Sequence, residues 1–141
     1  MMARITETLE IPLFPLGSVL FPGGALPLRI FETRYMDMAK ACLRDNLPFG
    51  VCLIAEGEEV GTPATPYDIG TLATISTWDM PQLGLLNITA SGERRFIIQE
   101  RWIEHSGLQK ARVELLPGEN AFPLPEEYER LLPLIRRVLR E

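Results

Sequence analysis

The sequence predicts a mainly β fold of the α+β class, in which adjacent antiparallel strands close into a barrel-like sheet with one inserted helix. Three observations predict this fold. The 141 residues include 12 prolines and 11 glycines, too many helix breakers for an all-α bundle. Strand-like stretches separated by turn residues fill most of the chain, and one stretch of its first half has a helical period. The length suits one main domain, which can bury a core without disulfides or metal.

The chain begins with two predicted strands. Residues 8 to 14 alternate weakly between apolar and polar positions, and residues 25 to 30 predict a second strand after a turn at residues 22 to 24. Pro12 and Pro27 lie inside these strands. Because proline has no backbone N–H to donate to a ladder, both prolines indicate edge positions or bulges.

A helix over residues 33 to 45 follows. Its apolar stripe is formed by Phe31, Tyr35, Met38, Ala39, Cys42 and Leu43. The opposite face carries Arg34, Asp37, Lys40, Arg44 and Asp45. Glu32 and Arg34 near the helix start are expected to pair with each other's neighbours or with Arg29. The pattern predicts a helix that lays its apolar side on the sheet.

The second half of the predicted domain is a succession of strands. Residues 49 to 56 predict a strand buried on both faces, and the polar residues 57 to 68 predict an exposed loop. Further strands are expected at residues 69–78, 84–90, 95–104 and 108–116, with turns at 79–82, 91–93 and 106–107. Residues 8–116 should therefore form one β domain.

The pattern changes after Pro117. Residues 117–124 predict a linker, and residues 125–141 predict a helix kinked at Pro133. This helix has an apolar stripe wider than one side of a barrel needs. We expect it to be the first helix of a helical subdomain that the 141 residues do not complete, so the chain suits a fragment or a reduced member of a larger protein.

The residues that catalysis requires are scarce. His105 is the one histidine, no serine lies in a GxSxG motif, and no GxxxxGK[ST] loop is present. Cys42 and Cys52 lie in apolar stretches without CxxC spacing, so we expect two buried free thiols rather than a metal site. The sequence therefore predicts no enzyme activity, no catalytic residues, no cofactor and no metal.

Charge and hydropathy limit the partners and the compartment. The net charge of −5 argues against a nucleic-acid-binding surface. The longest apolar run is far shorter than the roughly 20 residues of a membrane span. Acidic residues and prolines near the N-terminus are unlike a signal peptide, so we expect a cytoplasmic protein that does not bind membranes.

Three sequence blocks resemble the N-terminal substrate-binding domain of the Lon protease family, which also occurs as stand-alone proteins and within cereblon-like adaptors. The family pattern P-L-F-P-L, V-L-F-P-G and L-P-L-x-I-F-E-x-R-Y is similar to residues 12–16, 19–23 and 26–35. A G-T-x-A-x-I block resembles residues 70–75, and a G-x-x-R-F block resembles residues 92–96. The signature residues, expected to be structural, are Pro12, Phe14, Pro15, Phe21, Pro22, Gly23, Pro27, Phe31, Glu32, Arg34, Tyr35, Gly70, Gly92, Arg95 and Phe96.

The resemblance implies a twisted β pseudo-barrel similar to the PUA-like folds, followed by a helical subdomain. The family's ATPase and Ser-Lys protease modules have no counterpart in these 141 residues. The resemblance therefore implies a non-enzymatic module that binds unfolded or exposed protein segments, or one specific partner protein.

Two surfaces are candidates for protein binding. One is an exposed hairpin tip with Trp78, Met80 and Leu83. The other is the stripe of Leu131, Leu134, Ile135 and Val138, which packing on a helical subdomain would also explain. An alternative is an RNA-binding PUA-like barrel using Arg94, Arg95, Arg101 and Arg112. A small-molecule pocket with perturbed titratable groups is a third possibility. The sequence leaves the oligomeric state open.

Overall fold

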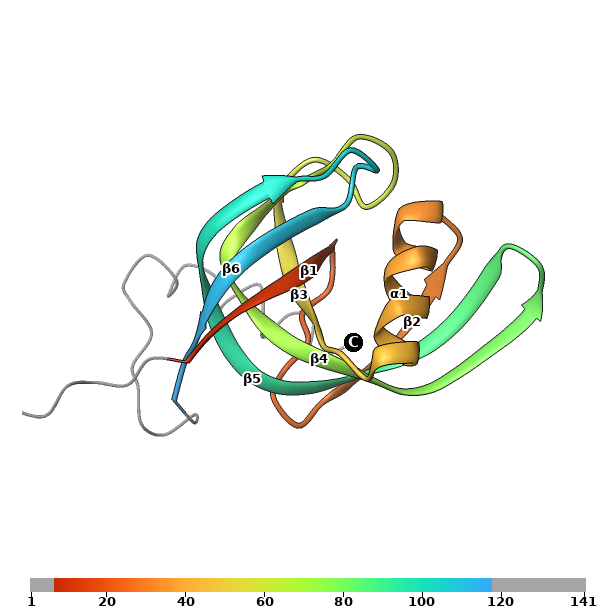
Figure 1. Cartoon of the computed structure of the whole chain (residues 1–141), viewed down its shortest axis with the longest axis horizontal. Helices are drawn as coiled ribbons and strands as arrows, with labels where there is room; N and C mark the ends of the chain where they lie inside the picture. The colour runs from red at the N-terminus through yellow and green to blue at the C-terminus, as the bar shows by residue number, and fades with distance from the viewer. Residues whose placement is uncertain (1–6, 118–141) are drawn as a thin grey trace, which may run out of the picture.

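The computed structural model describes residues 7–117, which form a twisted β-barrel with one helix beside it (Figure 1). The elements are β1 (Thr8–Leu16), β2 (Ala25–Ile30), α1 (Thr33–Asp45), β3 (Phe49–Glu56), β4 (Thr65–Gln82), β5 (Leu85–Ile103) and β6 (Gln109–Leu115). This arrangement confirms the predicted mainly β fold with one inserted helix. The predicted linker at 117–124 lies outside the described residues except for Pro117, and the predicted helix at 125–141 lies wholly outside them.

The strands form a ring with one strand attached. Their order is β2-β5-β4-β3-β1-β6, and a further pairing of β5 with β6 closes the barrel. β2 pairs with β5 alone, so it lies outside the ring at the edge of the described sheet. The consecutive strands β3, β4, β5 and β6 pair in antiparallel fashion, as expected, whereas β1 and β3, which are not consecutive in the chain, are parallel. α1 forms part of the connection between these two strands and lets them run in the same direction.

β4 and β5 are longer than the sequence predicted. The predicted turn at residues 79–82 is the end of β4, and the chain reverses at Leu83 and Gly84 instead, where Gly84 has a φ of 82°. The predicted turn at residues 91–93 lies inside β5, where Gly92 pairs with Ala73 of β4. β5 therefore continues through this glycine, pairing first with β2 and then with β6.

The two prolines for which edge positions or bulges were predicted, Pro12 and Pro27, occupy positions that need no hydrogen-bond donor on one side. Pro27 lies in the edge strand β2, as predicted. Pro12 lies where β1 changes its neighbour, since the residues up to Pro12 pair with β6 and those from Leu13 onward pair with β3. A missing N–H is tolerated at both places because a partner strand is absent there or changes.

α1 has the predicted bounds but not all of the predicted faces. It ends at Asp45 and is capped by Asn46, which has a φ of 54°, and the N–H of Leu47 donates to the Cys42 carbonyl at 3.0 Å. Phe31 precedes the helix and is exposed, so it does not belong to the apolar stripe. Arg34, which was expected on the solvent face, is buried.

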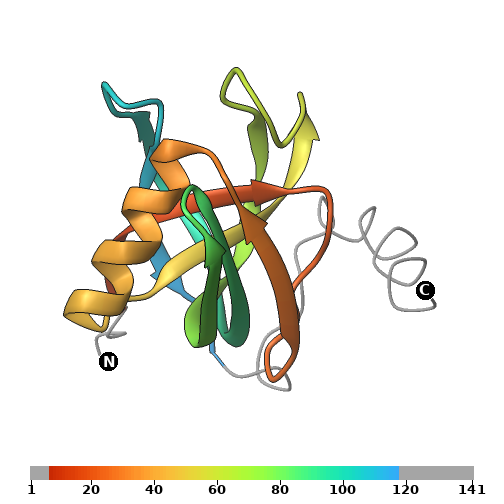
Figure 2. The same cartoon turned by 90° about the vertical axis from the view of Figure 1, so that its right-hand side faces the viewer.

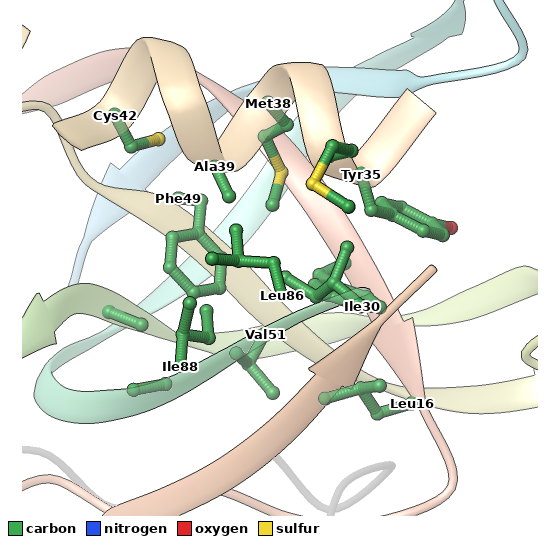
Figure 3. Close-up of a cluster of buried hydrophobic side chains, with 14 of the residues drawn as sticks. Leu16, Ile30, Tyr35, Met38, Ala39, Cys42, Phe49, Val51, Leu86 and Ile88 are labelled. Carbon is green, nitrogen blue, oxygen red and sulfur yellow. The ribbon is translucent and has the colours of Figure 1, made fainter. Parts of the chain in front are cut away.

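The main core lies between α1 and the sheet (Figure 3). Tyr35, Met38, Ala39 and Cys42 of the helix point toward a group of strand side chains. These strand residues include Leu16, Ile30, Phe49, Val51, Leu86 and Ile88. A second cluster fills the barrel itself, formed by Ile11, Leu13, Cys52, Phe96, Ala111 and Val113. Both cysteines are buried free thiols, as predicted.

Candidate protein-binding surface

Many of the family-signature residues hold the fold together. The rings of Phe14 and Tyr35 stack with centroids 4.1 Å apart and planes 9° from parallel. The Arg34 guanidinium lies 4.7 Å from the Tyr35 ring centre on the helix. Phe96 is fully buried, and a Cβ on Gly70 would come within 2.6 Å of its ring. These signature residues therefore make packing contacts within the fold.

Glu32 and Arg34 pair with each other and not with Arg29 or with one another's neighbours. Their side chains approach to 3.1 Å, and Arg34 also donates to the Gly107 carbonyl at 3.3 Å. The arginine therefore ties the start of α1 to the turn between β5 and β6. Its role explains why it is buried, because the charge is compensated by a carboxylate, a carbonyl and an aromatic face.

The hairpin of β4 and β5 extends beyond the barrel on the side of α1 (Figure 1). At its tip, Trp78 is 58% exposed and Leu83 is 94% exposed. Met80 differs, because it is partly buried and packs against the main core. The predicted tip residues thus divide into two exposed side chains, Trp78 and Leu83, and one, Met80, that packs against the core.

A shallow groove of about 390 Å³ lies beside Trp78. β2, β4 and β5 all contribute to it, with Pro27, Leu28, Arg29, Thr77, Trp78, Asp79, Asn87, Ile88 and Thr89 as its lining. Figure 2 shows the projecting hairpin and β2 side by side on the face that carries this groove. Trp78 therefore adjoins a hollow on a three-strand surface and is not an isolated exposed ring.

A second groove, of about 320 Å³, borders the other side of β2. Residues of β2 line it together with the end of β1, the start of α1 and the loop between β3 and β4. Phe31 and Val60 line this groove and are 56% and 54% exposed. Sequence reasoning missed this groove, although an exposed phenylalanine directly before a helix and a valine within a polar loop were visible signals.

A third cleft, of about 400 Å³, separates α1 from β1 and the turn before β6. Leu9 and Leu47 contribute exposed apolar surface to it. Arg34 also lines it, and the Nε atom of that arginine has no hydrogen-bond partner among residues 7–117. This cleft could not be predicted from local sequence patterns, because its walls come from three separate parts of the chain.

The described residues offer no arrangement typical of catalysis or metal binding. Burial raises the pKa of Cys42 to about 11 and that of Cys52 to about 12. Raised values keep the thiols protonated and unreactive at neutral pH. Within residues 7–117, no three His, Cys, Asp or Glu side chains are close enough to share a metal ion.

Three of the four arginines of the RNA-binding alternative are occupied by other groups. Arg94 pairs with Glu7 at 2.8 Å, and Arg112 lies 3.7 Å from Glu100. Arg101 donates to the Gln109 side chain at 2.7 Å. The two ion pairs reduce the charge that the barrel presents to a phosphate backbone.

The second predicted protein-binding surface lies outside the described residues. Its four apolar members are Leu131, Leu134, Ile135 and Val138. The helix that the structure describes, α1, is neither long nor apolar enough to cross a membrane.

Comparison with known proteins places this fold. Residues 10–141 match the family model of the ATP-dependent protease La (LON) substrate-binding domain. Two curated relatives are a Lon protease of Anaeromyxobacter dehalogenans, 29% identical over 93% of this chain, and protein cereblon of Danio rerio, 27% identical over 82%. The chain spans 16% and 27% of the length of these two relatives.

Solved structures agree with the family model. A Lon N-terminal domain protein from Xanthomonas campestris matches with a TM-score of 0.70 and 35% identity, covering 93% of this chain and 73% of that one. The N-terminal domain of a Mycobacterium avium complex Lon protease shares the fold, with a TM-score of 0.60 and 19% identity over 94% of this chain and 76% of that one. With the fold, its closed barrel and its signature contacts in place, the chain belongs to the LON substrate-binding domain family.

Proposed function

We propose that this chain is a non-enzymatic module that binds exposed, apolar segments of unfolded proteins through the tip of the β4–β5 hairpin. The observation that carries the proposal is the pair of large apolar side chains at the tip, Trp78 and Leu83, beside a groove of about 390 Å³. Aromatic anchors next to a hollow are typical of protein-binding sites. The name of the family, a substrate-binding domain of a protease, supports the same conclusion.

The proposal includes the absence of catalysis by this chain and a cytoplasmic location. The absence of catalysis is supported by the raised pKa values of Cys42 and Cys52, which leave no activated thiol among the described residues. Two buried free thiols also suit a reducing compartment. A specific folded partner that offers a similar apolar segment would use the same tip.

The test is binding to a chemically unfolded protein. We would label reduced ribonuclease A, with its thiols blocked by iodoacetamide, and follow its fluorescence anisotropy as the chain is added. Native ribonuclease A should not bind. The double variant Trp78→Ala/Leu83→Ser should weaken binding at least tenfold, because hot-spot aromatic residues dominate such contacts.

A matched control is Ile103→Ala. Ile103 is 54% exposed, close to the value of Trp78, but it ends β5 in the part that pairs with β6, away from the β4–β5 tip. Its replacement should leave the affinity unchanged. Equal weakening by both variants would show a non-specific apolar effect, and no binding by the unchanged chain would refute the proposed function.

A further inference from the structure

β2 has one paired side and one open side among residues 7–117. It pairs with β5 through six consecutive residues, from Ala25 with Ser91 to Ile30 with Leu86. No second strand of the described residues pairs with it. The backbone groups on its other side therefore have no strand to bond, and such an edge is a template for a further strand.

The alternation of hydrogen-bonded and non-hydrogen-bonded residue pairs between β2 and β5 shows which backbone groups of β2 face outward. The Gly92 N–H donates to the Gly24 carbonyl at 2.8 Å, which makes these two residues a bonded pair at the start of the ladder. Bonded and non-bonded pairs alternate in an antiparallel ladder, so Ala25, Pro27 and Arg29 direct their backbone groups away from β5. The open side therefore offers two N–H donors, from Ala25 and Arg29, and three carbonyl acceptors.

Two further observations agree with this assignment of outward-facing residues. Pro27, which has no N–H, falls on an outward position where β5 loses no hydrogen bond. Its partner Thr89 turns its carbonyl toward β4 and accepts a hydrogen bond from Ser76 at 3.1 Å. The pairing of β2 with β5 is thus complete without the backbone groups of Ala25, Pro27 and Arg29.

The groove of about 320 Å³ lies along this open side. Five consecutive β2 residues, Leu26 to Ile30, line it, whereas β5 contributes none of its lining. The opposite wall comes from the end of β1 and the loop that carries Val60. A strand added to β2 would place alternate side chains against apolar walls that include Leu16 and Phe31.

The charges at this groove are mixed. Glu32 and Glu59 line it together with one cation, Arg29. Glu32 is paired with the buried Arg34 at 3.1 Å, and Glu59 accepts a hydrogen bond from the Gly17 N–H at 2.6 Å. The groove therefore favours a partner through its apolar walls and the open backbone groups of β2 rather than through charge.

We propose that the open edge of β2 binds an extended segment of an unfolded protein by strand addition, with apolar side chains at alternate positions. This inference rests on the proposed function and names the backbone that takes part in it. Main-chain hydrogen bonds supply affinity in this mode of recognition, and the walls of the groove select the side chains. The adjoining groove beside Trp78 shares Pro27, Leu28 and Arg29, so one segment can contact β2 and the hairpin tip together.

The first experiment removes the two outward donors. Ala25→Pro/Arg29→Pro deletes both N–H groups, while the inward pairs with β5 stay intact. Arg29→Ala is the matched control, because it deletes the side chain and keeps the N–H. The probe is a fluorescein-labelled peptide in which Leu or Val alternates with Thr, with Lys at both ends, measured by anisotropy. The proline variant should bind at least tenfold more weakly than the alanine control, since two backbone hydrogen bonds are lost.

The second experiment does not depend on whether the proline variant folds. Hydrogen exchange of the unchanged chain is followed by NMR with and without saturating peptide. The Ala25 and Arg29 amides should gain at least tenfold protection, while the Leu26 and Leu28 amides, already paired with β5, should change little. Unprotected Ala25 and Arg29 amides in the saturated complex would overturn strand addition, even if the peptide binds.

The same experiments separate this inference from the proposed function. Binding of unfolded ribonuclease A that depends on Trp78 but is unaffected by the two prolines would keep the proposed function and reject the β2 edge. Failure of the peptide to bind, while unfolded ribonuclease A does bind, would reject it as well.

Discussion

Gly92, in the middle of β5, lies directly against the backbone carbonyl of Phe21 in the connection between β1 and β2. A methyl group on Gly92 would overlap this oxygen, and the neighbouring backbone cannot move aside as the end of a side chain can. Two hydrogen bonds hold the same contact, from Gly23 N to the Gly92 carbonyl at 2.9 Å and from Gly92 N to the Gly24 carbonyl at 2.8 Å. The connection between β1 and β2 therefore packs directly against β5 at Gly92.

We predict that Gly92→Ala destabilises the domain by about 2 to 4 kcal/mol, because the methyl group forces the connection away from β5. Urea denaturation followed by circular dichroism would measure this change. Ser91→Ala is the control, since it alters the neighbouring residue without adding a Cβ, and it should cost less than about 1 kcal/mol. Equal stability of the Gly92 variant and the unchanged chain would contradict the described contact with Phe21.

Arg34 gives a prediction about a buried cation. Its side chain is 7% exposed and holds Glu32, the Gly107 carbonyl and the Tyr35 ring. Arg34→Ala should destabilise by about 2 to 4 kcal/mol, because it removes all three contacts and leaves the carboxylate without its partner. Arg34→Lys should restore part of this loss at most, since an ammonium group lacks the planar fork of a guanidinium.

The control for Arg34 is Arg44, whose ion pair with Asp45 is on the surface. Thermal denaturation of Arg44→Ala should show no measurable change, because exposed ion pairs contribute little. A lysine variant at position 34 as stable as the unchanged chain would show that the charge alone, and not the geometry of the guanidinium, matters there.

The buried thiols of Cys42 and Cys52 predict that the free energy of unfolding decreases at alkaline pH. Burial raises the pKa of Cys52 from 9.0 to about 12 and that of Cys42 from 9.0 to about 11. The folded state thus keeps protons that the unfolded state releases, so stability from this source is fully present below pH 9 and falls as the pH rises toward 12. Urea denaturation between pH 8 and pH 11 should show this fall, and Cys52→Ala should make it shallower.

Thiol labelling offers an independent measurement of the same burial. At pH 8 the folded chain should react with an aromatic disulfide reagent much more slowly than the urea-unfolded chain, in which both cysteines are accessible. Rapid labelling of either cysteine in the folded chain would contradict the burial of both thiols. An unchanged pH slope in Cys52→Ala would assign the alkaline loss to other groups, such as Tyr35, whose pKa is also raised by burial.

One helix and two strands were predicted correctly from short-range sequence patterns. The bounds of α1, β2 and β3 agree with their predictions, because a helical stripe and short apolar runs determine them. Gly92 was misassigned to a turn, since its need for a small residue comes from Phe21, far away in the sequence. The parallel pairing of β1 with β3 was missed for the same reason, because only the closed ring of strands makes these two neighbours.

The candidate surface was predicted in part. Trp78 and Leu83 were named from turn residues near them, although the reversal itself lies at Leu83 and Gly84. The burial of Arg34 could not be foreseen, because its partners include a carbonyl of a turn 73 residues away. The open edge of β2 depends on which strands pair, so Pro27 was its one sequence signal.

Trp78 should report directly on binding through its fluorescence. The chain has two tryptophans, and Trp102→Phe leaves Trp78 as the single emitter. At 58% exposed, Trp78 should be readily quenched by acrylamide in the free protein. Ribonuclease A contains no tryptophan, so its unfolded form adds no signal. Saturation with it should shift the emission to shorter wavelength and reduce quenching at least twofold, because the ring leaves water. The reciprocal variant Trp78→Phe, which retains Trp102, should show neither change. A Trp78 that stays fully quenchable when binding is complete would place the contact elsewhere, since a ring in the interface cannot remain open to solvent.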